Sequence, residues 1–162
     1  MNKDENTPDP RINLFHAWPE GYRAMSDLQR VIDQSDLEPA LAELVKMRAS
    51  QLNGCAYCID MHSKDARALG ETEQRLYALS AWADTPFFTA RERAALALTE
   101  AVTLVADTRV PDQVLAEARS ELGDAEIAKL VLAIVAINGW NRMAITARLP
   151  VGGYRSRETN GT

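Results

Sequence analysis

The sequence predicts an all-α fold with a single domain, and three observations support this prediction. Apolar residues recur three and four positions apart in one segment after another, which is the period of a helix. No segment shows the alternation and turn punctuation of paired strands, and no repeat of fixed period is present. At 162 residues the chain suits one domain with a sizeable core. We therefore expect about seven helices around one core.

Capping residues and glycines set the expected ends of these helices. Ser35 and Asp36 are candidate caps of the second helix, and Thr89 with Glu92 has the spacing of a capping box before the fifth. Gly54 separates the second helix from the third, because glycine readily adopts the left-handed conformation of a helix end. The seven expected helices cover residues 18–34, 37–52, 55–69, 72–82, 90–106, 111–122 and 125–148.

Apolar spacing indicates which helix faces are buried. The first helix has one apolar stripe, formed by Met25, Leu28, Val31 and Ile32. Two later segments, 94–106 and 127–137, are apolar on nearly every side. Such helices lie at the centre of a domain or are covered by another subunit, so we expect a homo-oligomer. The 127–137 run is too short to cross a bilayer, which argues against a membrane protein.

Composition excludes other classes of protein. A hydrophobic fraction of 46% with 25% charged residues is that of an ordinary globular protein, and the net charge of −5 argues against a nucleic-acid surface. The N-terminal MNKDENTPDP lacks the basic-then-apolar pattern of a secretory signal, so a cytoplasmic location is expected. We expect residues 1–13 to be a flexible lead-in, 14–149 to form the helical domain and 150–162 to be a loose tail.

Both cysteines and one of the two histidines lie in a single short stretch. Cys55 and Cys58 are three positions apart and His62 follows four later, so on a helix they share one face. Thiols in the first turn of a helix feel the positive end of its dipole, which favours the thiolate. His62 can accept the proton of a thiol or stabilise the thiolate as an imidazolium. The spacing is therefore typical of a redox or metal site.

Three interpretations of this stretch follow from the residues alone. A dithiol redox site is favoured, because a close cysteine pair in a reducing cytosol is seldom a structural crosslink. A metal site would use Cys55, Cys58 and His62, with His16, Glu43 or water as a fourth ligand, but the chain offers no second ligand pair. The third interpretation is a pair of small buried cysteines beside a satisfied histidine. His16 itself is more simply a bystander or a cap.

Other polar residues near these segments also have two interpretations. Glu43 lies off the apolar stripe of its helix, which favours a solvated side chain over a catalytic one. Asp65, one turn after the histidine, is either an exposed acid or a group that orients the imidazole. Asn138, Asn141 and Arg142 either satisfy helix ends and hydrogen bonds between helices or help to line a site.

The order Glu43, Cys55, Cys58, His62 resembles the Glu…Cys-x-x-Cys-x-x-x-His signature of the alkylhydroperoxidase AhpD-like proteins, within the carboxymuconolactone decarboxylase superfamily. Further segments look like that family: LVKMRASQLNGCAYCIDMHSKDARALGET, TARERAALALTEAVT and INGWNRMAI. The resemblance covers roughly residues 37–149, with the core motif at 37–85. It implies a single-domain AhpD-like helical fold that assembles into trimers or larger rings such as hexamers.

The resemblance also implies an activity and a role for each residue of the signature. Cys58 would be the peroxidatic thiol of a thiol-dependent peroxidase, Cys55 the resolving thiol, His62 a proton-transfer group and Glu43 the end of the proton relay. The partners would be a hydroperoxide substrate and a dithiol reductant protein, with no cofactor and no metal. Antioxidant defence would be the corresponding cellular role.

One position departs from the pattern of the family. Its better-known peroxidases have a histidine immediately before the second cysteine, where this chain has Tyr57, whose phenol is not a base at neutral pH. Two alternative functions therefore stay open. One is a non-catalytic metal-binding or redox-sensing protein. The other is a carboxymuconolactone-decarboxylase-type enzyme, which fits less well because the true lactone decarboxylases lack the cysteine pair.

Overall fold

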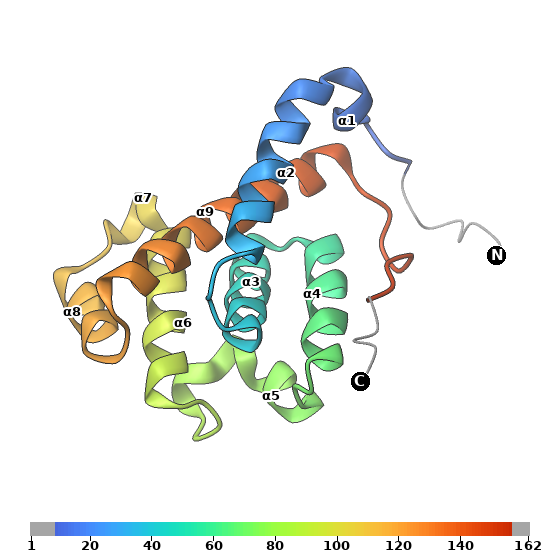
Figure 1. Cartoon of the computed structure of the whole chain (residues 1–162). Helices are drawn as coiled ribbons and strands as arrows, with labels where there is room; N and C mark the ends of the chain where they lie inside the picture. The colour runs from blue at the N-terminus through green and yellow to red at the C-terminus, as the bar shows by residue number, and fades with distance from the viewer. Residues whose placement is uncertain (1–8, 157–162) are drawn as a thin grey trace.

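The computed structural model describes residues 9–156, which form helices joined by short connections (Figure 1). Within this range there is no strand, so the all-α prediction is confirmed, with somewhat more helices than the seven expected. The elements are α1 (Leu14–Ala17), α2 (Pro19–Asp33), α3 (Pro39–Asn53), α4 (Ala56–Ala68), α5 (Glu73–Ala78), the 3₁₀ helix η1 (Leu79–Asp84), α6 (Ala90–Thr103), α7 (Val105–Thr108), α8 (Asp112–Glu121) and α9 (Asp124–Ala147).

The additional elements come from breaks inside two expected helices and from a short turn before the first. The expected helix 72–82 begins as α5 and tightens into η1, where Ala81 leaves helical geometry. The expected helix 90–106 ends at Thr103, because the backbone of Leu104 (φ −96°, ψ 34°) changes direction before α7. The turn α1 begins after Asn13, whose side chain accepts the His16 amide.

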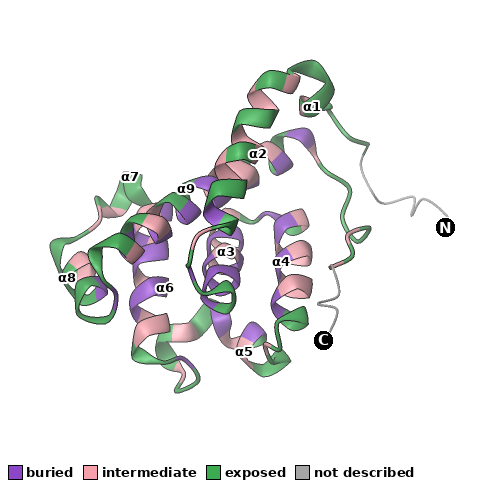
Figure 2. Cartoon of the chain, viewed as in Figure 1, coloured by how far each residue is buried: buried purple, intermediate pink, exposed green. Residues whose placement is uncertain are grey.

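Helix α3 lies at the centre of the fold. It packs against α4, α6 and α9, while α8 covers α6 and α2 packs along α9 (Figure 1). The largest apolar cluster includes Val45 of α3, Leu98 of α6 and Ile134 of α9, and each of these is almost fully buried. The buried residues concentrate on the inner helices, and α7 at the periphery is largely exposed (Figure 2). This packing fixes α3 and α4 side by side.

Two expectations about the first helices were wrong. Val31 is 60% exposed, because the face of α2 that packs against the core is narrower than the predicted stripe; Met25, Leu28 and Ile32 do pack there. Ser35 and Asp36 do not cap α3, which starts at Pro39 after Glu38 and has no side-chain cap. The Ser35 hydroxyl instead donates to the Ile32 carbonyl, and Asp36 pairs with Lys129. A proline in the first helical position needs no cap for its missing N–H, which allows this late start.

The other helix-end signals are confirmed. The Thr89 hydroxyl accepts the Glu92 amide and the Glu92 carboxylate accepts the Thr89 amide, which completes the capping box of α6. Gly54 has a left-handed backbone (φ 67°) and ends α3. Because this conformation strains any residue with a Cβ, glycine is required where the chain turns from α3 into α4.

Helix α9 is the longest element, with 24 residues. By length and composition alone it is apolar enough to cross a membrane, which the shorter run 127–137 did not suggest. In the structure it packs against α2, α3, α4 and α6, and Leu130 and Ile134 are fully buried. On another face, Leu132 and Val135 are 47% and 50% exposed. The helix is thus a core helix with one uncovered apolar face.

The two ends of the described chain lie against the domain. The Arg11 amide donates to the Ala147 carbonyl at the end of α9, and the Lys64 ammonium donates to the Tyr154 carbonyl. Of the expected lead-in 1–13 and tail 150–162, residues 1–8 and 157–162 lie outside the described residues. The described parts of both segments therefore run close to α4 and the end of α9.

Candidate active site

The cysteine pair stands at the start of α4. Cys55 is the residue before the first helical position, and its Sγ accepts the Cys58 amide at 3.3 Å. The two sulfurs are joined in a disulfide, with the Cα atoms 5.3 Å apart. Both side chains are buried, at 1% and 2% exposure. The pair therefore lies at the positive end of the α4 dipole, where a thiolate is stabilised once the disulfide is reduced.

Glu43 and His62 form a buried pair between α3 and α4. His62 Nδ1 lies 2.8 Å from Glu43 Oε2, and the Lys46 ammonium lies 2.9 Å from Glu43 Oε1. Lys46 is also 3.7 Å from the Asp33 carboxylate on α2. The expectation of a solvated Glu43 was wrong, because α3 is buried on nearly every side and the side chain of Glu43 meets His62 of α4. The signature residues Glu43, Cys55, Cys58 and His62 come together as the motif implied.

The charge state of Glu43 determines which ring nitrogen of His62 carries the hydrogen. Burial by itself would raise the pKa of Glu43, but the His62 hydrogen bond and the Lys46 charge outweigh it and hold that pKa below its ordinary value. The carboxylate is therefore ionised and accepts from Nδ1–H. His62 Nε2 is buried and has no hydrogen-bond partner among the described residues. In the neutral ring this Nε2 is the atom with the free lone pair, so it can act as a base.

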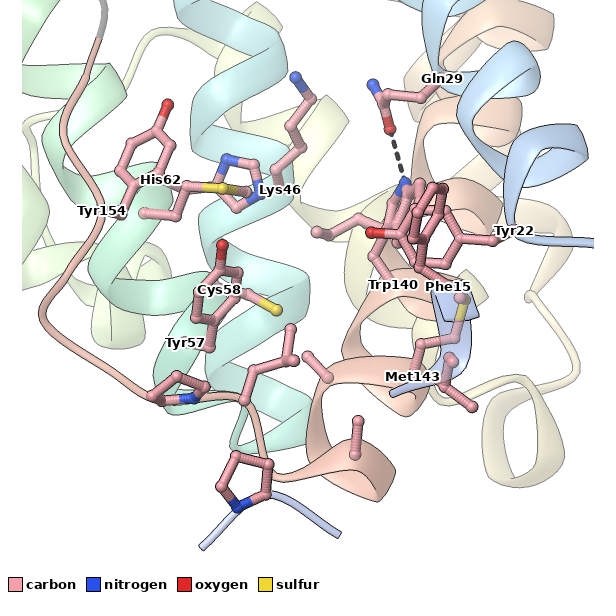
Figure 3. Close-up of a pocket in the computed structure, with 18 of the residues that line it drawn as sticks. Phe15, Tyr22, Gln29, Lys46, Tyr57, Cys58, His62, Trp140, Met143 and Tyr154 are labelled. Atoms are coloured by element: carbon pink, nitrogen blue, oxygen red, sulfur yellow. Dashed lines mark hydrogen bonds between the residues drawn. The ribbon is translucent and has the colours of Figure 1, made fainter. Parts of the chain in front are cut away.

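A cavity of about 700 Å³, here called the large cavity, adjoins these residues. Tyr57, Cys58 and His62 stand on one side of it, and Phe15, Tyr22 and Trp140 stand on the other (Figure 3). The aromatic side is held in place by ring contacts of 5.4 Å from Tyr22 to Phe15 and to Trp140. The Trp140 indole N–H also donates to the Gln29 amide oxygen at 3.1 Å. The cavity thus has one reactive wall and one aromatic wall.

The aromatic wall was not anticipated from the sequence. Phe15 and Tyr22 come from α1 and α2, whereas Trp140 comes from α9, more than a hundred positions later in the chain. Trp140 lies within the family-like segment INGWNRMAI, but the sequence did not indicate that it faces Phe15 and Tyr22. Met143 near the end of α9 lies on the same side of the large cavity (Figure 3), while Ala144 packs against the cysteine pair.

Tyr154 and Asp65 also line the large cavity, with Tyr154 on the same side as His62 (Figure 3). The Tyr154 hydroxyl donates to both Asp65 oxygens, at 2.8 and 3.0 Å. Burial, then the hydrogen bond and charge of Asp65, raise the pKa of Tyr154 to about 12. Asp65 is half-buried and engaged, so the expectation of a simply exposed acid was wrong. The Asp65 carboxylate and the tyrosine together anchor the C-terminal segment on α4.

The metal ligand set considered from the sequence does not assemble. The sulfurs of Cys55 and Cys58 are shared in the disulfide, and His16 is exposed on α1 and does not line the large cavity. Donor atoms of Glu43, His62 and Asp65 do lie within 4.8 Å of one another. The Lys46 ammonium already occupies one Glu43 oxygen, and its charge opposes a cation at that position.

The asparagines near the end of α9 join it to α3. The Asn53 side-chain amide donates to Asn138 and Asn141, at 3.0 and 2.8 Å, and the Asn141 amide donates to the Ser50 hydroxyl at 3.0 Å. Arg142 donates to the Asn138 carbonyl and side chain. None of these three α9 residues lines the large cavity. This outcome matches the interpretation as a hydrogen-bond network between helices, which holds the reactive wall to the aromatic wall.

Comparisons with known proteins agree with this site and fold. Residues 19–101 match the model of the carboxymuconolactone decarboxylase family. The uncharacterized protein YdfG of Bacillus subtilis is 44% identical over 135 residues, covering 83% of this chain and 92% of YdfG. Among solved structures, ATU0492 of Agrobacterium tumefaciens superimposes with a TM-score of 0.87 at 40% identity, covering 90% of this chain and all of ATU0492. ATU0492 is described as a protein of unknown function provisionally assigned as the antioxidant defence protein AhpD.

A more distant structure shares the fold alone. The debrominase Bmp8, solved in complex with 2,3,4-tribromopyrrole, has a TM-score of 0.76 at 19% identity, covering 86% of this chain and 74% of Bmp8. The family match spans half of the chain, and the fold shared with ATU0492 agrees with it. This chain belongs to the carboxymuconolactone decarboxylase family, with an AhpD-like fold.

Proposed function

We propose that the protein is a thiol-dependent peroxidase that reduces hydroperoxides through the Cys55–Cys58 pair. One observation carries the proposal. The Cys55–Cys58 pair lies at the start of a helix, and Cys58 lines a cavity that is also lined by a histidine paired to a buried carboxylate. A nucleophilic thiol, a base beside it and a space for the substrate are the parts that such a reaction needs. The description of ATU0492 as a provisional AhpD supports the same activity.

The reaction starts from the reduced pair. The Cys58 thiolate attacks the terminal oxygen of a hydroperoxide, the O–O bond breaks, and the products are the Cys58 sulfenic acid and an alcohol. The Cys55 thiol then attacks the sulfenic sulfur and releases water, which leaves the disulfide present in the structure. We assign Cys58 to the first step because it lines the large cavity together with His62, whereas Cys55 does not line it.

His62 supplies the proton transfers. Its free Nε2 accepts the thiol proton of Cys58, directly or through water, and returns a proton to the leaving alkoxide. Glu43 stabilises the imidazolium formed in between, and Lys46 keeps Glu43 ionised. Tyr57 does not replace the second histidine of the better-known peroxidases as a base, so His62 performs both transfers alone.

An external dithiol restores the pair, and the cytoplasm is the compartment where such reductants are maintained. Mixing the oxidised protein with a dithiol and then with cumene hydroperoxide tests the activity. We expect consumption of the peroxide by the wild type, none above background with Cys58→Ser, and formation of the Cys55–Cys58 disulfide in the mass spectrum. Equal peroxide consumption by the wild type and Cys58→Ser would refute the proposal.

Helix α4 itself offers a matched control for that experiment. Ser63 is half-buried and its hydroxyl donates to the Asp60 carbonyl, so Ser63→Ala removes one hydroxyl of α4 without touching the large cavity. We expect Ser63→Ala to consume peroxide at the wild-type rate. A loss of activity in this variant as well would attribute the Cys58→Ser result to damage of α4 and not to the thiol.

A further inference from the structure

The two cysteines of the pair line different cavities. Cys58 lines the large cavity, and Cys55 lines a second cavity of about 210 Å³, here called the small cavity. Neither cysteine belongs to the lining of the other cavity. The disulfide therefore bridges two separate spaces, with one sulfur at the wall of each.

Three residues line both cavities and so form the partition between them. They are Tyr57, which stands between the cysteines in sequence, Ala144 of α9 and Leu149 just after α9. Cys55, Cys58, Ala144 and Tyr57 also form one packed apolar cluster, so the partition is continuous with the disulfide. Tyr57, at the position where the family's better-known members have a histidine, thus forms part of the partition.

The small cavity opens at the surface between several apolar side chains and the half-buried Arg148. Among the side chains around it, Ile145, Leu149 and Val151 are 45%, 38% and 49% exposed. Gly54 and Ala56 on the other side are exposed and small, which leaves room next to Cys55. Cys55 itself is only 1% exposed, so the space beside it is the route by which another molecule reaches its sulfur.

We propose that the small cavity is the access route of the reducing thiol, and that this thiol attacks Cys55 and not Cys58. The inference rests on the proposed peroxidase function and adds where its reductant binds. In thiol–disulfide exchange the attacking thiolate approaches one sulfur in line with the S–S bond, and the other sulfur leaves. A thiolate in the small cavity meets Cys55 first, since Cys55 and not Cys58 lines that space.

The electrons and protons balance along this route. The thiolate of an external dithiol bonds to Cys55 Sγ, the Cys55–Cys58 bond breaks, and Cys58 leaves as a thiolate. The second thiol of the reductant then attacks its own sulfur in the mixed disulfide, so the reductant becomes a disulfide and Cys55 is released with a proton. Cys58 leaves at the helix start beside His62, where a thiolate is stabilised, and a better leaving group makes exchange faster.

Separate cavities keep the two half-reactions apart. The hydroperoxide approaches Cys58 through the large cavity while the reductant approaches Cys55 through the small one, so neither has to leave before the other binds. The reductant's sulfur must pass an opening lined by apolar side chains and by Arg148, which suits a thiol on an apolar arm or one next to a carboxylate.

Trapping the mixed disulfide in the wild-type protein tests the choice of sulfur. The oxidised protein is mixed with glutathione as a monothiol probe, quenched within seconds with N-ethylmaleimide, and fragmented in a mass spectrometer. We expect glutathione on Cys55 and the maleimide on Cys58. Glutathione on Cys58 with the maleimide on Cys55 would overturn the proposal, and so would an equal mixture.

A matched pair of variants on α4 tests the route. Ala56 and Ala68 are both exposed alanines of this helix, but only Ala56 lines the small cavity. We expect Ala56→Trp to slow reduction of the disulfide by dithiothreitol about tenfold or more, because blocked access lowers exchange rates. We expect Ala68→Trp to leave that rate unchanged. Unchanged reduction in Ala56→Trp would overturn the access route.

A second measurement separates this inference from the proposed function. Chemically reduced Ala56→Trp is mixed with cumene hydroperoxide in a single turnover, and disulfide formation is followed by mass spectrometry. We expect the wild-type rate, because the large cavity is unchanged. A slowed peroxide step would overturn the separation of the two cavities. Absence of this step in the wild type would refute the peroxidase proposal, while the trapping experiment would still report which sulfur a thiol attacks.

Discussion

The buried carboxylate of Glu43 lies 2.8 Å from His62 Nδ1, although the two residues are 19 positions apart on different helices. This contact joins α3 to α4 close to the cysteine pair and leaves His62 Nε2 as the atom available for chemistry. Glu43 is thus a positioning residue, and His62 is the group that would exchange protons with Cys58. The stability and the activity of the protein should both depend on this pair.

Glu43 should make stability fall on acidification. The pKa of Glu43 in the folded protein is below the ordinary 4.5. The ionised carboxylate therefore contributes fully to the free energy of unfolding above pH 4.5, and this contribution is lost as the pH falls through the pKa of the folded state. We expect Glu43→Gln to unfold at lower denaturant concentration than wild type at pH 7, with the difference shrinking as the pH falls below 4.5. Urea titrations at several pH values measure this, with the exposed Glu117→Gln as control. A gap that stays constant with pH would contradict the assignment.

Tyr154 should be the last tyrosine to ionise. Its pKa is raised to about 12 by burial and by Asp65, so among the four tyrosines its absorbance change should come at the highest pH. The phenol of Tyr154 holds its proton more tightly in the folded state. Its contribution to the free energy of unfolding is therefore full below pH 10 and is lost as the pH rises toward 12. We expect Tyr154→Phe to remove the late step from a spectrophotometric titration, and Tyr77→Phe, at an exposed position, to retain it.

Asn141 should be important for stability without taking part in the chemistry. It is fully buried and bonds to Asn53 and Ser50, so Asn141→Leu removes two hydrogen bonds between α9 and α3 and leaves an unpaired acceptor site on the buried Ser50 hydroxyl. We expect a loss of about 1–3 kcal/mol in the free energy of unfolding. Arg142→Ala, one position away and exposed, should cost less than about 1 kcal/mol. Denaturant unfolding compares the two, and equal losses would show that the network is not what holds α9 to α3.

The protein should form a homo-oligomer through α9. Leu132 and Val135 stand next to each other on its uncovered face, about half-exposed, on a helix that is otherwise packed into the core. We expect light scattering to give a mass that is a multiple of 17.9 kDa, in line with the trimer or hexamer that the family resemblance implies. Leu132→Asp should shift the mass toward one chain, because a charge in an apolar interface is costly. A wild-type mass equal to that of one chain would contradict this prediction.

Much of the fold could be predicted from interactions between residues that are close together in the sequence. Helix periods, the Thr89–Glu92 capping box and the left-handed Gly54 act within a few residues, so the sequence alone determined the all-α class and the turn into the cysteine helix. The spacing of Cys55, Cys58 and His62 is equally local. One helical turn puts them on one face, whatever surrounds that helix.

Only the tertiary structure decided what those residues face. Periodicity on α3 identified an apolar stripe but could not show that neighbouring helices cover its other faces too, so Glu43 was expected in solvent and is buried. The aromatic wall of Phe15, Tyr22 and Trp140 and the partition through Tyr57 depend on contacts between segments far apart in the chain. Such contacts depend on how the helices pack together, which no short stretch of sequence specifies. Packing therefore gives each cysteine its own cavity.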